Sequence, residues 1–171
     1  MLYTRKGDTG TTKLYGCDGR IAKDDVRIDA LGTLDELNSY VGLCRAFAVD
    51  RDTTSALLSF QEVLFVIQAQ VAGAKKFLPK DSVASLEAII AAVETEIDPI
   101  HSFTISGASL VSAHLDVART IARRAERSVI AIRDSSLDIV IPYLNRLSSA
   151  LFALARRAAQ RARVKEHAPR Y

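Results

Sequence analysis

The chain has 171 residues, of which 49% are hydrophobic and 25% are charged, and its formal net charge is +3. This length suffices for one domain with a substantial core and argues against two, and the composition is that of an ordinary globular protein. No apolar run approaches the ~20 residues that a membrane span needs, and the N-terminus lacks the apolar region and cleavage site of a secretory signal. We therefore expect a cytoplasmic protein that does not contact a membrane.

The first 25 residues form a polar N-terminal arm. Its stretch YTRKGDTGTT, residues 3–12, combines glycines, threonines, two bases and an acid before any apolar period begins. The default interpretation is a frayed terminus. The alternative is a loop that wraps an anion, because glycine lets successive amides converge and lysine or arginine supplies positive charge. The stretch does not fit the Walker pattern G-x-x-x-x-G-K-[ST].

Five stretches after the arm repeat an apolar spacing of three and four residues, which is typical of amphipathic helices. They cover residues 34–48, 57–71, 83–97, 115–132 and 144–158. No stretch alternates with period two for long enough to predict a strand. The sequence therefore predicts an all-α fold in a single domain spanning 1–171. We expect an antiparallel five-helix bundle at about residues 26–165, preceded by the extended N-terminal loop arm at 1–25.

Two acids stand where helix caps are expected. Asp81 precedes the third apolar stretch, and Asp138, followed by Pro142, fits the first turn of the fifth helix. Cysteine and histidine are too sparse for a metal site, since Cys17 and Cys44 have no metal-ligand spacing and the histidines stand singly at positions 101, 114 and 167. We expect a reduced protein without a structural metal or a disulfide.

An arginine-rich stretch lies in the fourth predicted helix. Arg119, Arg123 and Glu126 stand at i, i+4 and i+7, on a stripe that flanks the apolar seam. Glu126 is placed to pair with Arg123, and a polyphosphate could accept bidentate bonds from the remaining arginines. The commoner fate of such a run is a solvated surface, but its position beside the seam favours a helix–helix or subunit boundary.

A second group of bases lies near the C-terminus: Arg156, Arg157, Arg161, Arg163 and Lys165. No aromatic residues interleave with them to stack on nucleobases. We therefore expect a solvated helix face here, with a nucleic-acid site as the alternative.

Two polar pairs remain. Asp35 and Glu36 could do acid–base work, but helix N-termini attract acids in any case, and composition favours that simpler reason. Asn145 and Arg146 lie beside a leucine seam, where asparagine is unusual and could contact a ligand or a metal-bound water. The sequence holds no Ser-His-Asp or Cys-His pattern.

Five motifs follow one another along the chain. They are Tyr3-Thr-x-x-Gly7-Asp8-x-Gly10-x-Thr12, Lys23-Asp24-Asp25, Gly32-Thr-x-Asp35-Glu36-Leu-Asn38, Arg119-x-x-x-Arg123-Arg124-x-Glu126-Arg127 and Tyr143-Leu-Asn145-Arg146-Leu-Ser148. In this order and spacing they resemble the PduO-type ATP:cob(I)alamin adenosyltransferases, and the match extends to about Ala159.

The resemblance implies a five-helix bundle that assembles as a homotrimer, with ATP bound where two subunits meet. The implied reaction transfers the 5′-deoxyadenosyl group of ATP to the cobalt of cob(I)alamin, forming adenosylcobalamin and releasing triphosphate, with Mg²⁺ present. Both ATP and the corrinoid are substrates, and nucleic acid is not an expected partner. Cob(I)alamin is itself a strong nucleophile, so the protein need not supply one.

The resemblance also implies roles for individual residues. ATP would be bound by Thr4, Arg5, Lys6, Gly7, Asp8, Gly10, Thr11, Thr12, Lys13, Lys23, Arg123, Arg124, Glu126, Arg127 and Asn145, and Asn145 would also lie near Mg²⁺. Asp35 would pair with Arg119 across the subunit interface. The candidate catalytic residues would be Arg119, Arg123, Glu126 and Phe103.

Phe103 would lie under the corrin ring on the corrinoid side of the site and fill the place of the lower axial ligand. From its loop position alone, a hydrophobic plug onto the bundle is the more common role. For the whole chain, two other hypotheses stay open: a non-catalytic ATP-binding helical regulatory bundle, and a basic module that binds nucleic acid through its C-terminal helix.

Overall fold

The computed structural model describes residues 3–15 and 18–170, so Cys17 lies outside the described residues. Its helices are α1 (Val26–Phe47), α2 (Arg51–Val71), α3 (Ser82–Glu94), α4 (Leu110–Ala131) and α5 (Val140–Arg161), with the 3₁₀ helix η1 (Ser135–Leu137) before α5. The predicted five-helix fold is confirmed. The arm also contains two strands that were not predicted, β1 (Thr11–Thr12) and β2 (Ile21–Ala22), which pair antiparallel.

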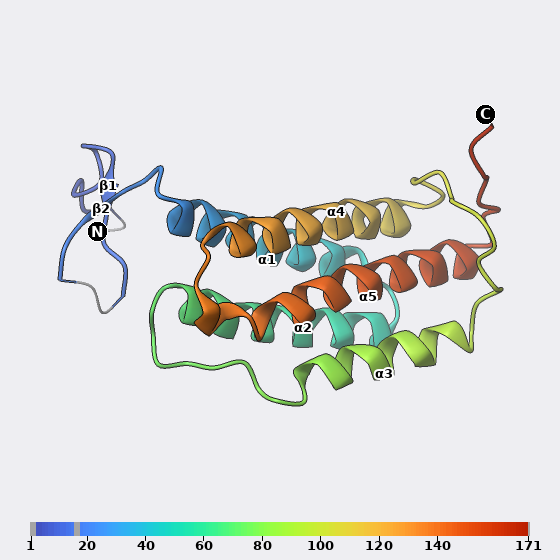
Figure 1. Ribbon diagram of the computed structural model, residues 1–171. Coiled ribbons are helices and arrows are strands. Elements are labelled where there is room, and N and C mark those ends of the chain that lie inside the picture. Colours follow the sequence, from blue (N-terminus) through green and yellow to red (C-terminus); the bar gives the residue numbers. More distant parts are fainter. Residues whose placement is uncertain (1–2, 16–17, 171) are drawn as a thin grey trace.

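Helices α1 and α4 run antiparallel along one side of the bundle (Figure 1). Asp29, Glu36 and Tyr40 of α1 contact Ser128, Arg124 and His114 of α4, respectively. Residue numbers therefore fall along α4 as they rise along α1, which is the pattern of an antiparallel pair. Helix α5 packs against α4 and α3, while α2 packs against α1.

The apolar stripes form one buried core. Leu34, Leu37 and Val41 of α1 have no exposed surface, and neither do Leu57 and Leu64 of α2. Alanines at positions 118, 122 and 125 of α4 and at 150 and 155 of α5 are also fully buried, so these two helices approach closely. Cys44 is a free, buried cysteine, and burial raises the pKa of its thiol to about 12. The thiol is therefore protonated and unreactive at neutral pH.

The expected caps are only partly right. Asp81 does occupy the N-cap position of α3, but its side chain makes no capping hydrogen bond; its backbone carbonyl accepts from Ser85 instead. Asp138 precedes the N-cap of α5, which is Ile139 without a side-chain cap bond. The side-chain caps that form are Asp25 on α1, Asp50 on α2, Ser109 on α4 and Asp134 on η1.

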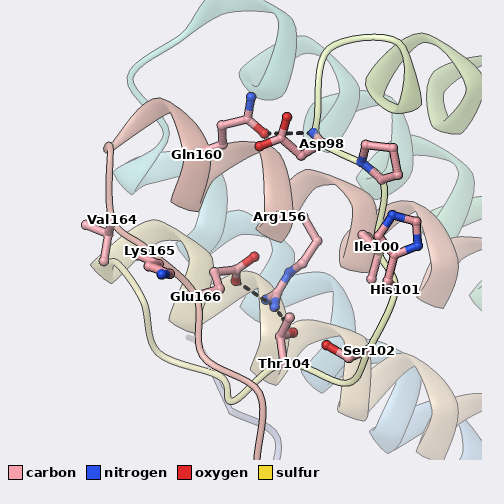
Figure 2. A pocket seen from close by; sticks show the side chains of 11 residues that line it. Asp98, Ile100, His101, Ser102, Thr104, Arg156, Gln160, Val164, Lys165 and Glu166 are labelled. Carbon is pink, nitrogen blue, oxygen red and sulfur yellow. Dashed lines mark hydrogen bonds and ion pairs between the residues drawn. The ribbon is translucent and has the colours of Figure 1, made fainter.

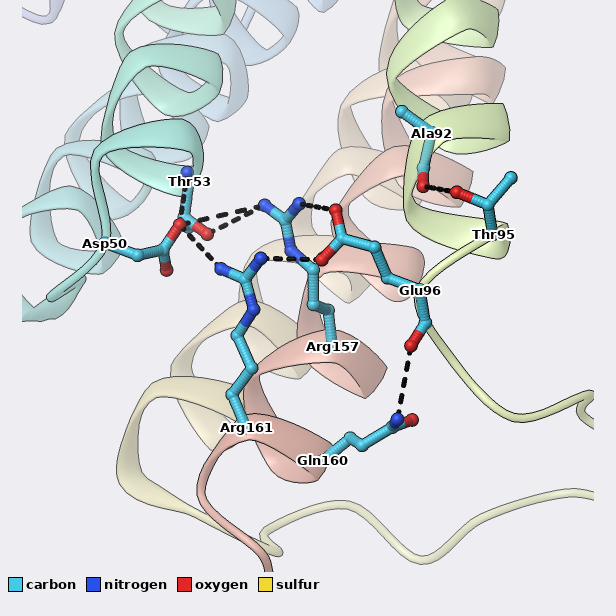
Figure 3. Close-up of polar contacts among 8 residues, drawn as sticks. All are labelled: Asp50, Thr53, Ala92, Thr95, Glu96, Arg157, Gln160 and Arg161. Atoms are coloured by element: carbon cyan, nitrogen blue, oxygen red, sulfur yellow. Dashed lines mark hydrogen bonds and ion pairs between the residues drawn. The ribbon is translucent and has the colours of Figure 1, made fainter.

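The solvated face expected for the C-terminal bases is wrong for Arg156 and Arg157, whose exposed fractions are 3% and 5%. Arg157 donates to Thr53 at 3.0 Å and to Glu96 at 3.2 Å. Figure 3 shows Arg161 beside it, bridging Asp50 and Glu96 at 2.9 and 2.6 Å. This network joins the start of α2 and the end of α3 to α5, because a buried guanidinium requires acidic partners.

The carboxylates of this network are held ionised. Burial tends to raise the pKa of Asp50, but hydrogen bonds from Thr53 and the charges of Arg161 and Arg157 outweigh it, so the pKa falls below its usual value. For Glu96, desolvation is likewise outweighed by Arg161 and Arg157, and its pKa is also lowered.

The arm and the segment between α3 and α4 lie at opposite ends of the bundle (Figure 1). The arm leads into the first turn of α1, whereas residues 95–109 and the chain after α5 lie near the first turn of α4.

None of the helices in the described ranges is long and apolar enough to cross a membrane.

Candidate functional site

The arm folds into consecutive tight turns. The amide of Asp8 donates to the carbonyl of Arg5 at 3.3 Å, and the amide of Gly10 donates to the carbonyl of Gly7 at 3.2 Å. Arg5 has a φ of 59° and Gly10 a φ of 77°, values of the left-handed region that favours glycine. Turns of this kind can direct several amides toward one anion.

Lys23 lies over this loop. Its amide donates to the carbonyl of Gly10 at 2.9 Å, and its Nζ lies 3.1 Å from where a Cβ on Gly7 would stand. A side chain at position 7 would therefore displace the ammonium group. The structure thus brings together Gly7, Gly10 and Lys23, three residues predicted to bind ATP.

Arg20 is a residue of the arm that the sequence analysis missed. Its Nε donates to Thr11 Oγ1 at 2.8 Å, and its Nη2 donates to the carbonyls of Thr11 and Lys6. Arg20 thereby ties the two sides of the arm together. Nothing in its spacing identifies this role, because its partners are set by the turn geometry of the loop.

The arginines of α4 differ in their bonding partners. Arg124 pairs with Glu36 of α1 at 2.5 Å, and Arg127 donates to the carbonyl of Arg123 at 2.9 Å. Arg123 itself is exposed. In the part of the chain that the structure describes, its guanidinium forms no ion pair, and the expected pairing with Glu126 is wrong.

Glu126 instead accepts a hydrogen bond from Asn145 Nδ2 at 3.1 Å. The two are 19 residues apart and meet where α4 packs against α5. Asn145 Oδ1 accepts from Arg146 Nη1 at 3.2 Å, and Arg146 Nε pairs with Glu87 at 2.8 Å. Within residues 3–15 and 18–170 no cluster of three or more His, Cys, Asp or Glu side chains forms a metal site.

Asp35 and Arg119 do not meet within the chain. Asp35 is exposed on α1 and has no ion-pair partner among the described residues. The Nε of Arg119 is buried without a hydrogen-bond partner, and its nearest acid is Asp116, whose Oδ1 is 3.9 Å away. An unpaired buried donor is costly, so this guanidinium has unused bonding capacity.

Phe103 projects from the segment before α4 and is 79% exposed. The plug interpretation is therefore wrong, because a plug would bury the ring against the bundle. Beside it lies a cavity of about 530 Å³ lined by Ile100, His101, Ser102, Phe103, Phe152, Ala168 and Pro169. An exposed aromatic ring at the edge of an apolar-lined cavity is suited to contact a large flat ligand.

Comparison with known proteins gives the family. A family model described as cobalamin adenosyltransferase matches residues 2–158. The chain belongs to this family. It is 42% identical over 164 residues to the corrinoid adenosyltransferase of Citrobacter freundii, covering 91% of this chain and 93% of that one. It is 37% identical to the corrinoid adenosyltransferase PduO of Salmonella typhimurium, of which it spans about half, 48%.

Solved structures agree. An Arg-to-Lys variant of the PduO-type ATP:corrinoid adenosyltransferase of Lactobacillus reuteri, complexed with ATP, superposes with a TM-score of 0.92 at 29% identity, covering 99% of this chain and 100% of that one. A Phe-to-Ala variant from the same organism, complexed with cobalamin and ATP, has a TM-score of 0.94 at 27% identity, with both chains fully covered. The fold predicted from the sequence and the family resemblance are both confirmed.

Proposed function

We propose that this protein transfers the 5′-deoxyadenosyl group of ATP to the cobalt of cob(I)alamin and releases triphosphate. The observation that carries the proposal is the arm, in which glycine turns and Lys23 form a basic loop suited to a polyphosphate. Membership of the cobalamin adenosyltransferase family and the relatives solved with ATP and cobalamin support it.

The chemistry needs orientation and charge stabilisation from the protein. The cobalt(I) electron pair attacks C5′ of ATP, the C5′–O bond breaks, and its electrons leave on triphosphate. The nucleophile belongs to the substrate, so the protein must align C5′ with cobalt and stabilise the departing anion. Lys23, Arg123 and Arg127, with the arm amides, suit the second task because triphosphate accumulates negative charge as the bond breaks.

We infer that Glu126 and Asn145 contribute to Mg²⁺ binding. Mg²⁺ binds proteins through one or two oxygen ligands, keeps several waters and coordinates substrate phosphates. The Glu126 carboxylate, oriented by a hydrogen bond from the Asn145 NH2 group, fits this role. The Asn145 oxygen would join it on giving up the hydrogen bond from Arg146. When bound, the ion would neutralise charge on the triphosphate. This chain's own contribution is to hold Glu126 in one orientation through Asn145.

We also infer a homotrimer with its active sites between subunits. The arm and the segment 95–109, which carries Phe103, lie at opposite ends of α1 and α4, and a helix of 22 residues is about 33 Å long. One ATP molecule cannot contact the arm and place C5′ over the Phe103 of the same chain across that distance. If a neighbouring subunit supplies the Phe103 segment, one ATP molecule can contact both the arm and that segment.

We also infer a cytoplasmic location, which suits a reaction that requires ATP and reduced cobalt.

The proposal is tested by incubating the purified protein with ATP, Mg²⁺ and chemically reduced cobalamin. We expect a light-sensitive cobalt–carbon product together with one triphosphate per product molecule. ATP binding without that product would instead indicate the non-catalytic regulatory bundle. Binding to nucleic acid that weakens steeply with salt and ignores ATP would favour the third hypothesis.

A further inference from the structure

Arg156 of α5 lies at the end of the bundle that bears Phe103, and its side chain is 3% exposed. Figure 2 shows its guanidinium directed toward Thr104 and Glu166. It pairs with Asp116 of α4 at 2.5 Å and with Glu166 at 2.7 Å, and it donates a hydrogen bond to Thr104 Oγ1. These three partners come from α4, from the chain after α5 and from the segment before α4.

A buried arginine that joins three segments restricts how those segments can be arranged. Removing a guanidinium from water is costly unless its donors are paired, so the pairs are kept only in arrangements that bring all partners together. Asp116 also faces Arg119, with 3.9 Å between Oδ1 and Nε. Two arginines and two acids therefore share this cluster.

The backbone reinforces the same arrangement. The amide of Ile105 donates to the carbonyl of His167 at 2.8 Å, so the segment before α4 and the chain after α5 lie side by side. Thr104 and Ile105 directly follow Phe103, and both are bonded to the rest of the molecule. Phe103, at 79% exposed, has almost no packing of its own to fix its direction.

We propose that Arg156 is a positioning residue, which sets the orientation of Phe103 through Thr104 and locks the C-terminal segment beside it through Glu166. This inference rests on the proposed function in that Phe103 is taken to contact the corrinoid. Arg156 lines a cavity of about 320 Å³ beside this segment. Its guanidinium is already paired with Asp116, Glu166 and Thr104, so it acts through the segment that it anchors.

Two variants test the anchor without removing the buried arginine. Thr104→Val deletes the hydroxyl acceptor at nearly constant volume, and Glu166→Gln removes the charge of the tail partner. Glu96→Gln is the matched control, since Glu96 also accepts bonds from α5 arginines, Arg157 and Arg161, away from the Phe103 segment. The two anchor variants should remain folded because Arg156 keeps Asp116. The control should remain folded because Arg157 keeps Thr53 and both arginines keep Asp50.

The first readout needs no activity. Hydrogen exchange of the Ile105 amide in the unliganded protein should speed up at least about fivefold in Thr104→Val and Glu166→Gln, because their anchor opens more often. It should remain unchanged in Glu96→Gln. Unchanged exchange in both anchor variants would overturn the proposal, whether or not the protein is an adenosyltransferase.

The second readout separates positioning from general stability. We expect the anchor variants to bind ATP as the wild type does. With cob(II)alamin and a one-electron reductant, their turnover should be lower by about fivefold or more, since small misplacements are costly in oriented reactions. Adding Thr104→Val to Phe103→Ala should cause no further loss, because the hydroxyl acts through the ring. Independent, additive losses would contradict the proposal. A wild-type protein that forms no product would refute the proposed function alone, leaving the exchange result to decide the anchor.

Discussion

Arg123 has an exposed guanidinium that forms no ion pair within the described residues, although several bases lie on the same helix. We expect Arg123→Ala to weaken ATP binding by about 10- to 100-fold, because a charge-assisted bond to phosphate contributes on the order of 1.5–3 kcal/mol. Calorimetric titration with ATP measures the effect. Arg51→Ala, which removes an exposed arginine from the first turn of α2, is the control. Equal ATP affinity in the two variants would contradict the role of Arg123.

Phe103 offers a second test at the scale of one side chain. Because the ring is 79% exposed, Phe103→Ala should fold and bind ATP normally. It should lose most turnover when the assay starts from cob(II)alamin and a one-electron reductant, and less when it starts from cob(I)alamin, since an occupied lower axial position makes cobalt(II) harder to reduce. Spectroscopy of bound cob(II)alamin reports its coordination number. A four-coordinate spectrum equal to that of wild type would rule out the ligand-displacing role.

The sequence predicted which residues are charged and which stand near one another on a helix, but it could not predict their partners. Glu126 has Arg123 one turn before it, yet it bonds to Asn145, because α5 packs beside that face of α4. Arg156 and Arg157 resemble any exposed basic run until Asp116 and Glu96, 40 and 61 residues away, are folded against them. Long-range pairing of this kind leaves no periodic signal in one sequence.

At the scale of elements, the link between α1 and η1 should depend on pH. Asp134 accepts hydrogen bonds from Ser136 and from Arg27 of α1, which hold the pKa of its carboxyl at about 2. Its pKa in the unfolded chain is about 3.9, so the contribution is present above that pH and is lost as the pH falls toward 2.

We therefore expect Asp134→Asn to lower the melting temperature at pH 7 and to lower it progressively less as the pH falls from about 4 to 2. Thermal melts of the wild type and of Asp134→Asn across this pH range measure the difference in melting temperature. Because both proteins carry the same other acids, the effect of titrating those acids cancels in the difference. A difference that stays constant with pH would show that the carboxylate charge is not what stabilises the link.

The helices were predictable because apolar residues spaced three and four apart lie on one face only in an α-helix, and that face must be buried. Their ends were less so. Asp81 and Asp138 are of a residue type that commonly caps helices, but neither side chain makes a capping hydrogen bond to α3 or α5. Two-residue strands such as β1 and β2 are too short to produce an alternating pattern.

At the scale of the whole molecule, Asp35 and Arg119 test the subunit interface. Asp35→Asn and Arg119→Gln should each weaken assembly, because removing one member of a partly buried pair leaves the other charge unpaired. A double-mutant cycle read by sedimentation should give a coupling of roughly 0.5–3 kcal/mol. No coupling would mean that the two residues do not pair across the interface.

Mixed subunits test whether the arm and Phe103 of one site come from different chains. We would combine, by unfolding and refolding equal amounts together, Phe103→Ala with a Lys13→Ala/Lys23→Ala arm variant. With random assembly, half of the arms and half of the Phe103 segments are intact, so about one quarter of the sites have both. That fraction of wild-type turnover from cob(II)alamin is the expected result. Activity no higher than the average of the separate variants would place each site within one chain.

The sequence of a single chain could not establish such an assembly, since periodicity reports only what a chain buries against itself. Two features of one subunit support the proposed assembly: the Nε of Arg119 has no hydrogen-bond partner, and the arm lies at the opposite end of the bundle from the segment 95–109 that carries Phe103.

In the proposed reaction the C5′ carbon of ATP, and not its phosphate, forms the bond to cobalt. The most direct measurement uses ATP labelled with carbon-13 at C5′, incubated with the protein and cob(I)alamin and followed by carbon NMR in the dark. We predict that the label moves to a cobalt-bound methylene resonance that disappears on illumination, with intact triphosphate released in equal amount. A label that remains in ATP, or appears in ADP with orthophosphate, would rule out adenosyl transfer by this protein.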